Sequence, residues 1–302
     1  VGSEMCIRDR GIYCALVTPL NSDESIDTRG TQRLVKKVLA GGVHGILALG
    51  STGEQMALTT GAKEAFLKQL RRDIPTEIPM MVGCGATSTK LAIENCLQAE
   101  SCGADAVIVT APCFYPFGED QLVKYYEEIV QATHLPVYLY NISRFVGIKL
   151  TASLVARLAA DPRIQGIKES DRDEQLVRDL VAVTNHRENF SVIQGSDRIF
   201  LKSFRWGCKA GVTVVGNVEP ALAPQLYNAW KKGDEKEAEA LQEKLLEYVA
   251  VITSEGKYPQ ELKVILEHMG ICHDEMTSPY LPLLEKQKES IVAEWNALIC
   301  RR

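Results

Sequence analysis

The sequence contains no C-x-x-C pair, no histidines at the spacing of metal ligands and no long apolar run. Its nine cysteines are scattered and odd in number, which argues against a disulfide framework and suits the reducing cytoplasm. No segment reaches the roughly 18 continuous apolar residues that a membrane helix needs. We therefore expect a cytoplasmic protein with no metal site, no disulfide bonds and no membrane span.

An excess of one charge is also lacking. Among 302 residues, 34 lysines and arginines stand against 39 aspartates and glutamates, which gives a net charge of -5 at pH 7. Positive and negative residues are mixed along the chain. The sequence therefore has no basic stripe that would bind nucleic acid and no polybasic segment that would bind an anionic membrane. We expect a small-molecule partner, with neither nucleic acid nor a membrane as a ligand.

The first ten residues do not follow the pattern of the rest. Residues 1–10, "VGSEMCIRDR", show neither the apolar core of a signal peptide nor a helical or strand period. We interpret them as a non-native or disordered tail, and we expect the fold to begin at Gly11.

From Gly11 onward, short apolar runs alternate with longer segments of helical period. The runs lack the in-out alternation of half-exposed strands, which is typical of strands that are covered on both faces. The eight expected strands are residues 11–20, 45–50, 79–85, 106–111, 136–141, 164–168, 190–195 and 211–217.

Amphipathic segments separate these runs, and one more follows the last run. This eightfold alternation predicts a (β/α)8 TIM barrel over residues 11–233. A doubly wound open sheet is the alternative, but no G-x-G-x-x-G follows the first run. The expected helices are residues 31–40, 61–72, 90–102, 121–133, 152–160, 173–184, 199–206 and 221–232.

After the barrel the pattern becomes purely helical. Residues 235–254, 259–268 and 282–299 have helical period and predict a C-terminal three-helix extension over residues 234–302. We expect this extension to pack on the barrel or on a neighbouring subunit.

The reactive residues of a TIM barrel lie at the carboxyl ends of its strands, because the following loops converge there. Lys168, in "GIKES", ends the sixth expected strand in an apolar setting where an ammonium group lacks water. Burial disfavours the charged form of a lysine, and a neutral amine can attack a ketone to form a Schiff base. Taken alone, Lys168 is better explained as a solvated lysine on a loop than as a Schiff-base former. The neighbouring residues therefore decide between these two interpretations.

Tyr140 ends the neighbouring strand, and its phenol can exchange protons with a carbonyl or carbinolamine oxygen. The residues "GSTG", Gly50 to Gly53, offer two hydroxyl groups and exposed backbone N–H groups that suit a small carboxylate. Alone, Tyr140 fits a core aromatic equally well, and residues 50–53 could be a plain turn. Together with Lys168, Tyr140 and residues 50–53 predict a site that binds a 2-oxo acid and forms an iminium at its ketone.

Two nearby polar residues have expected structural roles. We interpret Glu54 as structural rather than as a base, and Asn141 as a residue whose side chain shapes the turn after the fifth strand. The five histidines fall on expected loops or helix ends without ligand spacing, and we assign them no role.

Four motifs together resemble a known family. "GSTGE", "YNI" followed by Gly147, "GIKES" and "GNVEP" at residues 216–220 are similar to those of the dihydrodipicolinate synthase / N-acetylneuraminate lyase family of pyruvate-type class I aldolases. The resemblance runs from about Gly11 to the end of the chain. It implies a TIM barrel with C-terminal helices, assembled as a homotetramer, without a metal or organic cofactor.

The resemblance also implies roles for individual residues. Lys168 would form the Schiff base with pyruvate, Tyr140 would donate and accept protons, and Ser51 would relay them. Thr52, in the cradle that begins at Gly50, would hold the substrate carboxylate. Val212 would contact the bound pyruvate through its backbone.

Three departures from the family pattern narrow the range of expected substrates. The synthases carry an arginine five residues after the tyrosine, where this chain has Phe145, and the nearest arginine is Arg144. At the position of the tyrosine that crosses to a neighbouring subunit, this chain has Phe114 with Tyr115 beside it. In the strand-seven loop, Asp197 and Arg198 replace two adjacent acids of the sialic acid lyase, and Val214 lies where that lyase has a serine.

We therefore predict a lyase that cleaves or forms a 2-oxo-3-deoxy sugar acid or a related 4-hydroxy-2-oxo acid, with pyruvate and an aldehyde as partners. Asp197 and Arg198 are expected to contact the substrate. The alternatives are a dehydratase of a deoxy-oxo sugar acid and dihydrodipicolinate synthase itself. A non-catalytic binder of 2-oxo acids and a phosphate-binding barrel enzyme are weaker alternatives, because Lys168 and Tyr140 are both present and the glycine-rich loops are poor.

Overall fold

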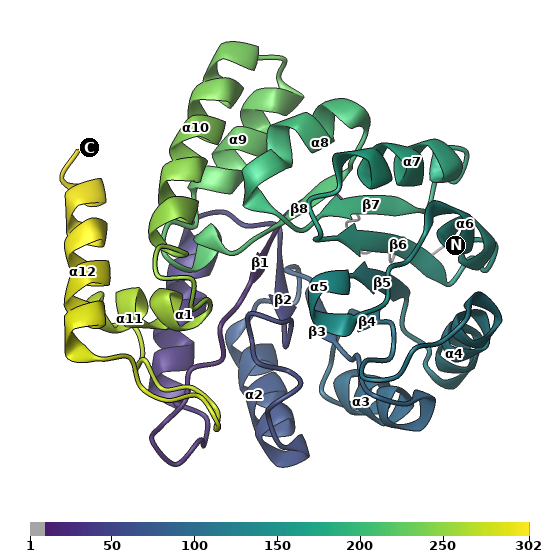
Figure 1. Ribbon diagram of the computed structural model, residues 1–302, viewed down its shortest axis with the longest axis horizontal. Coiled ribbons are helices and arrows are strands. Elements are labelled where there is room, and N and C mark those ends of the chain that lie inside the picture. The colour runs from purple at the N-terminus through teal and green to yellow at the C-terminus, as the bar shows by residue number, and fades with distance from the viewer. Residues whose placement is uncertain (1–9, 302) are drawn as a thin grey trace.

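The computed structural model describes residues 10–301, and a closed barrel of eight parallel strands lies at its centre (Figure 1). Each strand pairs with the next one in the chain, and β8 pairs with β1, which closes the sheet. The expected TIM barrel is therefore confirmed. The strands are β1 (Gly11–Ala15), β2 (Gly45–Ala48), β3 (Met80–Gly83), β4 (Ala106–Thr110), β5 (Val137–Asn141), β6 (Ile164–Glu169), β7 (Ser191–Gln194) and β8 (Ala210–Thr213).

Helices surround the barrel, and several begin at a side-chain cap. The hydroxyl groups of Thr59, Ser88 and Thr151 each accept a hydrogen bond from the backbone of the first helical turn that follows. The helices of this layer are α1 (Thr28–Ala40), α2 (Thr60–Asp73), α3 (Thr89–Ser101), α4 (Glu119–Ala132), α5 (Ser143–Val146), α6 (Ala152–Leu158), α7 (Glu174–Thr184), α8 (Phe200–Trp206) and α9 (Leu222–Lys231), with short 3-10 turns η1 (Asp197–Ile199) and η2 (Val215–Asn217).

The strands are shorter than the apolar runs that predict them. The first run extends to residue 20, but β1 ends at Ala15. Beyond it, the N–H of Val17 donates to the side chain of Asn217 rather than to a neighbouring strand, and Pro19 has no N–H to offer. The sequence pattern also does not predict α5, a single turn that Gly147 ends with a φ of 81°.

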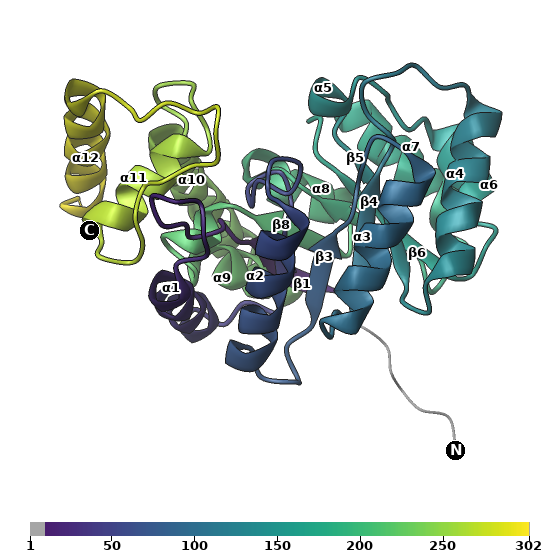
Figure 2. The same cartoon turned by 90° about the horizontal axis from the view of Figure 1, so that it is seen from below.

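Three helices follow the barrel: α10 (Glu235–Val251), α11 (Gln260–His268) and α12 (Glu285–Ile299). α10 packs on α9, whereas α11 and α12 lie beyond α1 on one side of the barrel in both views (Figures 1 and 2). Arg33 of α1 donates to the carbonyl of Ile271, which follows α11. The expected boundary between the barrel and the C-terminal extension, at residues 233 and 234, stays a prediction. No gap in packing marks it, because α10 packs directly on the barrel helix α9.

The expected N-terminal tail covers residues 1–10, of which residues 1–9 lie outside the described residues. Within residues 10–301, no helix is long and apolar enough to cross a membrane.

Candidate active site

Tyr140 and Lys168 lie next to each other at the carboxyl ends of β5 and β6. They are direct partners in the register of the two strands. Both side chains are 4% exposed, and the Nζ atom of Lys168 lies 4.3 Å from the centre of the Tyr140 ring. The structure thus brings together the amine and the phenol that the sequence places on neighbouring strands.

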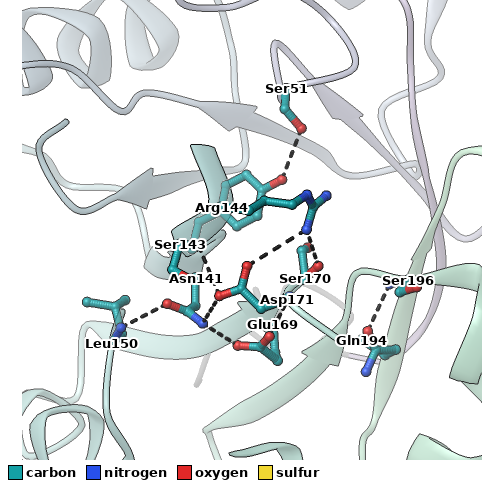
Figure 3. Close-up of polar contacts among 11 residues, drawn as sticks. Ser51, Asn141, Ser143, Arg144, Leu150, Glu169, Ser170, Asp171, Gln194 and Ser196 are labelled. Carbon is teal, nitrogen blue, oxygen red and sulfur yellow. Dashed lines mark hydrogen bonds and ion pairs between the residues drawn. The ribbon is translucent and has the colours of Figure 1, made fainter. Parts of the chain in front are cut away.

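The Tyr140 hydroxyl is polarised by its surroundings. It lies 3.2 Å from the hydroxyl of Ser51, which is exposed at the mouth of the barrel (Figure 3). Burial raises the pKa of Tyr140, but the charge of Lys168 and hydrogen bonds from neighbouring side chains outweigh burial and bring this pKa below its ordinary value. A phenol with a lowered pKa gives up and regains a proton more readily.

The loop after β2 has a strained backbone that presents its N–H groups. Leu49 and Glu54, which bracket the "GSTG" segment, have φ angles of 53° and 57°, a region that side chains rarely adopt. The N–H groups of Ser51 and Thr52 find no acceptor among residues 10–301. Two adjacent free N–H groups beside Tyr140 form a suitable cradle for a carboxylate.

Tyr258 enters the site from the C-terminal extension. Its hydroxyl lies 2.6 Å from the hydroxyl of Thr52, and burial raises the pKa of Tyr258 far above its ordinary value. The sequence pattern did not identify this residue, because nothing local marks the loop between α10 and α11 as part of the barrel mouth.

Glu54 has a structural role, as its position suggested. Its carboxylate lies 2.6 Å from the Nζ atom of Lys263 on α11, and both side chains are buried. The N–H and hydroxyl of Thr277 donate to its other oxygen. These contacts fasten the loop after β2 to the C-terminal extension.

Three other expected site residues lie on β8 or in η1, the short turn that follows β7. Val212 is buried on β8, opposite Tyr13 of β1. Asp197 is buried and accepts hydrogen bonds from the Thr213 hydroxyl and the Val214 N–H. Burial raises the pKa of Asp197 to about 6, although these hydrogen bonds and the charge of Lys168 lower it.

Arg198 points toward the extension, where its Nη2 atom lies 3.2 Å from the hydroxyl of Thr253. Its Nε atom is buried without an acceptor among the described residues. Of the expected site residues, Gly50, Ser51 and Tyr140 line the main cavity at the barrel mouth, whereas Asp197 and Arg198 do not, and neither do Lys168, Thr52 and Val212.

A buried polar network lies at the carboxyl ends of β5 and β6 (Figure 3). The amide of Asn141 donates to Glu169 and Asp171, and its oxygen accepts from the N–H of Leu150. Burial raises the pKa of Glu169 to about 7, against the hydrogen bonds from Asn141 and the Asp171 N–H. Asn141 thus joins the turn after β5 to the loop after β6, in line with its expected role.

Gly195 closes one side of Lys168. A Cβ atom at Gly195 would lie 1.9 Å from the Ser170 hydroxyl oxygen and 2.8 Å from Cε of Lys168. Only glycine allows this approach of the backbone after β7, which confines the lysine side chain.

A cavity of about 420 Å³ opens at the barrel mouth beside these residues. Tyr140, Ser51 and Gly50 are among the residues that line it, and its volume is within the range of small-molecule sites. Most of its wall is apolar and includes Leu49, Ile108, Ile142, Phe145, Val146 and Pro259.

Within the described residues 10–301, no cluster of three or more histidine, cysteine, aspartate or glutamate side chains is arranged to hold a metal ion. The expectation that the protein works without a metal or cofactor stays a prediction. The arrangement supplies an amine, a phenol, a hydroxyl and a carboxylate cradle, which are the groups that iminium chemistry on a 2-oxo acid requires.

Comparison with known proteins gives a consistent result. Residues 8–298 match the model of the dihydrodipicolinate synthetase family. The chain is 31% identical to a protein named as an uncharacterized DapA-like lyase from Halobacterium salinarum, over 94% of this chain and 92% of the relative. It is also 31% identical to a 4-hydroxy-tetrahydrodipicolinate synthase from Protochlamydia amoebophila, over 96% of each.

Solved structures agree with this result. The crystal structure of YagE from E. coli K12, a prophage protein of the dihydrodipicolinic acid synthase family in complex with pyruvate, superposes with a TM-score of 0.91 at 26% identity, over 96% of this chain and 98% of that one. Dihydrodipicolinate synthase from Thermotoga maritima also gives 0.91, at 28% identity and the same coverage. The chain therefore belongs to the dihydrodipicolinate synthetase family.

Proposed function

We propose that this protein is a pyruvate-dependent class I lyase that cleaves or forms a 4-hydroxy-2-oxo acid through a Schiff base on Lys168. The observation that carries the proposal is the pairing of Lys168 with Tyr140, with the amine 4.3 Å from the phenol ring and Ser51 within hydrogen-bond distance of the hydroxyl. Relatives named as lyases and synthases and a neighbour solved with pyruvate support it.

The first step joins substrate and enzyme. The Lys168 nitrogen attacks the C2 ketone and, after a proton moves from nitrogen to oxygen, gives a carbinolamine, which loses water to become an iminium. Tyr140 donates, through the neighbouring Ser51 hydroxyl, the proton that the leaving hydroxyl needs, and Tyr140 remains as a phenolate. The N–H groups of Ser51 and Thr52 hold the C1 carboxylate during this step.

The second step breaks the C3–C4 bond. The Tyr140 phenolate removes the proton of the C4 hydroxyl, the aldehyde leaves, and the electron pair of the broken bond moves into the iminium to give an enamine. Tyr140 then gives this proton to C3 and restores an iminium; water releases pyruvate and the free amine, and the proton set free returns to Tyr140. The buried Asp197 carboxylate lies within electrostatic reach of Lys168 and stabilises its cationic forms.

The dehydratase and the dihydrodipicolinate synthase alternatives use the same Schiff base. Product analysis separates them, because a dehydratase yields a new oxo acid without pyruvate. The synthase would condense pyruvate with aspartate semialdehyde, and Phe145 at the arginine position speaks against efficient binding of that charged aldehyde.

We further propose that the protein is a cytoplasmic homotetramer without a cofactor. Phe114 and Tyr115 support an assembly, because they are 81% and 62% exposed and their rings pack edge to face against each other. Large exposed aromatic side chains of this kind are typical of interfaces. Sedimentation velocity tests the proposed state, and a monomer at micromolar concentration would contradict it.

Trapping with borohydride tests the Schiff base. The protein is incubated with pyruvate and sodium borohydride, digested, and analysed by mass spectrometry. We expect a reduced pyruvyl adduct on Lys168, with none on exposed Lys149, and none anywhere in Lys168→Met. A folded wild-type protein without the adduct would overturn the proposal.

A further inference from the structure

The cavity at the barrel mouth extends well beyond the reacting groups. Tyr140 and Ser51 line one part of it, and the other walls come from the loops after β2, β3, β4 and β5 and from the C-terminal extension. The walls beyond Tyr140 are mainly aliphatic and aromatic, from Leu49, Ile108, Phe145 and Val146 among others. We call this part the tail cavity, because it lies where the portion of a substrate beyond C4 would extend.

Most polar groups in the wall of the tail cavity are already paired. Glu54 is bonded to Lys263 and Thr277, and the amide of Gln55 donates to the carbonyl of Gly85 at 2.7 Å. The hydroxyl of Tyr258 is paired with Thr52. These groups are therefore unavailable to a series of substrate hydroxyls.

Thr110 is the buried exception, whereas Tyr280, whose hydroxyl also has no partner among residues 10–301, is 47% exposed. Thr110 is 7% exposed, lines the cavity, and its Oγ1 atom is buried without a hydrogen-bond partner in the described part of the chain. Thr110 is also the register partner of Tyr140 across β4 and β5, so its hydroxyl lies one strand away from the reacting phenol. A buried unpaired hydroxyl is costly, which points to a ligand group as its partner.

No arginine, lysine or histidine of residues 10–301 lines the tail cavity. Arg144, one residue before Phe145, is engaged elsewhere. Its guanidinium donates to the carbonyl of Ser170 and faces the Asp171 carboxylate at 3.8 Å. A carboxylate or phosphate entering this apolar cavity would lose its hydration without gaining a cation.

We propose that the tail cavity binds the aldehyde-derived part of the substrate, and that this part is uncharged and mainly apolar, with one hydrogen-bonding group that pairs with the Thr110 hydroxyl. This inference rests on the proposed pyruvate lyase function and specifies its substrate class. It selects an aliphatic or aromatic 4-hydroxy-2-oxo acid over a sugar acid or a dicarboxylate.

A panel of aldehydes tests the inference in the direction of synthesis. Pyruvate is supplied at saturation, and kcat/KM is measured for hexanal, benzaldehyde, the three hydroxybenzaldehydes, glyceraldehyde and succinic semialdehyde. We expect the best apolar aldehyde to exceed glyceraldehyde and succinic semialdehyde at least tenfold. Equal or higher values for either of these two would overturn the inference.

Variants locate the binding to the tail cavity. Ala57 is exposed and lines this cavity, so Ala57→Phe should fill it and lower kcat/KM for the apolar aldehyde at least tenfold. Ala182→Phe is the matched control, because Ala182 is exposed on α7 away from the cavity, and it should leave kcat/KM unchanged. Equal effects of both variants would contradict the assignment.

Thr110→Val tests the polar anchor. We expect the variant to lose the two- to tenfold advantage of the best hydroxybenzaldehyde over benzaldehyde that one hydrogen bond gives. Because the hydroxyl is unpaired in the free protein, the midpoint of thermal unfolding should not fall. A lower midpoint with unchanged selectivity would show that Thr110 is structural only.

Borohydride trapping separates this inference from the function on which it rests. Each variant should still form the pyruvyl adduct on Lys168. An intact adduct with a preference for charged or polyhydroxylated aldehydes overturns the inference alone, whereas the absence of an adduct in the wild-type protein overturns both.

Discussion

Tyr140 and Lys168 are opposite each other on adjacent parallel strands, and the Lys168 amine lies over the face of the Tyr140 ring at 4.3 Å from its centre. The register of β5 and β6 fixes this relationship, so neither residue needs a flexible loop to reach the other. Two rigid strands hold an amine and a phenol with a lowered pKa in one small space. This pairing makes the roles of the two residues directly testable.

Tyr140→Phe should lower kcat by about 10² or more, because it removes the proton-transferring hydroxyl and keeps the ring. Pyruvate trapping on Lys168 should slow but persist. The matched control is Tyr125→Phe, which removes a buried hydroxyl bonded to the carbonyl of Thr110 on the outer side of the barrel. Equal losses of kcat in both variants would contradict the assigned role of Tyr140.

Stability should depend on pH through two buried acids. Burial raises the pKa of Asp197 to about 6 and that of Glu169 to about 7, so the folded protein holds protons that the unfolded chain releases near pH 4 to 4.5. The free energy of unfolding should therefore fall as pH rises from about 4 to 7. Glu169 contributes on the order of 3 kcal/mol to this fall.

Glu169→Gln separates the two acids. Between pH 6 and 7 Glu169 loses more of its proton than Asp197 does, so the variant should flatten the fall of the unfolding free energy in this window. Urea unfolding at half-unit pH steps measures it. A wild-type stability that rises between pH 6 and 7 would show that the Glu169 carboxylate is charged in the folded state well below pH 7.

The buried pair of Glu54 and Lys263 should be essential for stability. Lys263→Met leaves the Glu54 carboxylate buried without its cation, and we expect a loss of about 3–5 kcal/mol in urea unfolding. Lys124→Met is the control, because the pair of Lys124 and Glu128 is exposed to solvent and should contribute little to stability. Similar losses of unfolding free energy in the two variants would contradict this prediction, because they would show that the pair of Glu54 and Lys263 is as well solvated as an exposed pair.

Gly195→Ala should impair catalysis because its methyl group would collide with Ser170 and with Cε of Lys168. We expect slower pyruvate trapping and a reduced kcat. Gly61→Ala is the control, since a Cβ atom there has no neighbour within 4 Å and the residue lies in α2. This control should be neutral or stabilising by up to about 1 kcal/mol. A fully active Gly195→Ala would show that the lysine is not confined.

Tyr258→Phe should weaken pyruvate binding. Loss of the hydrogen bond to Thr52 loosens the carboxylate cradle, and we expect KM for pyruvate to rise about two- to tenfold. Unfolding in urea is measured alongside, because a general loss of packing would lower stability without a selective change in KM. An unchanged KM would place Tyr258 outside the site.

The sequence by itself determined the barrel and its reactive pair. Eight apolar runs without alternation can only be strands covered on both faces, and their spacing by amphipathic helices leaves the TIM barrel as the simplest closure. Because parallel strands end at one rim, Lys168 and Tyr140 were predictable as neighbours from their positions along the chain. These features follow from local periodicity, which a linear sequence records.

Tertiary structure decided what surrounds that pair. The contacts of Tyr258 with Thr52 and of Lys263 with Glu54 join segments about 200 residues apart, as the separations of 206 and 209 show, and no local pattern records such contacts. The direction of the Arg144 guanidinium and the unpaired Thr110 hydroxyl likewise depend on how loops fold over the rim. Strand order follows from periodicity, whereas the shape and polarity of the cavity follow from long-range packing.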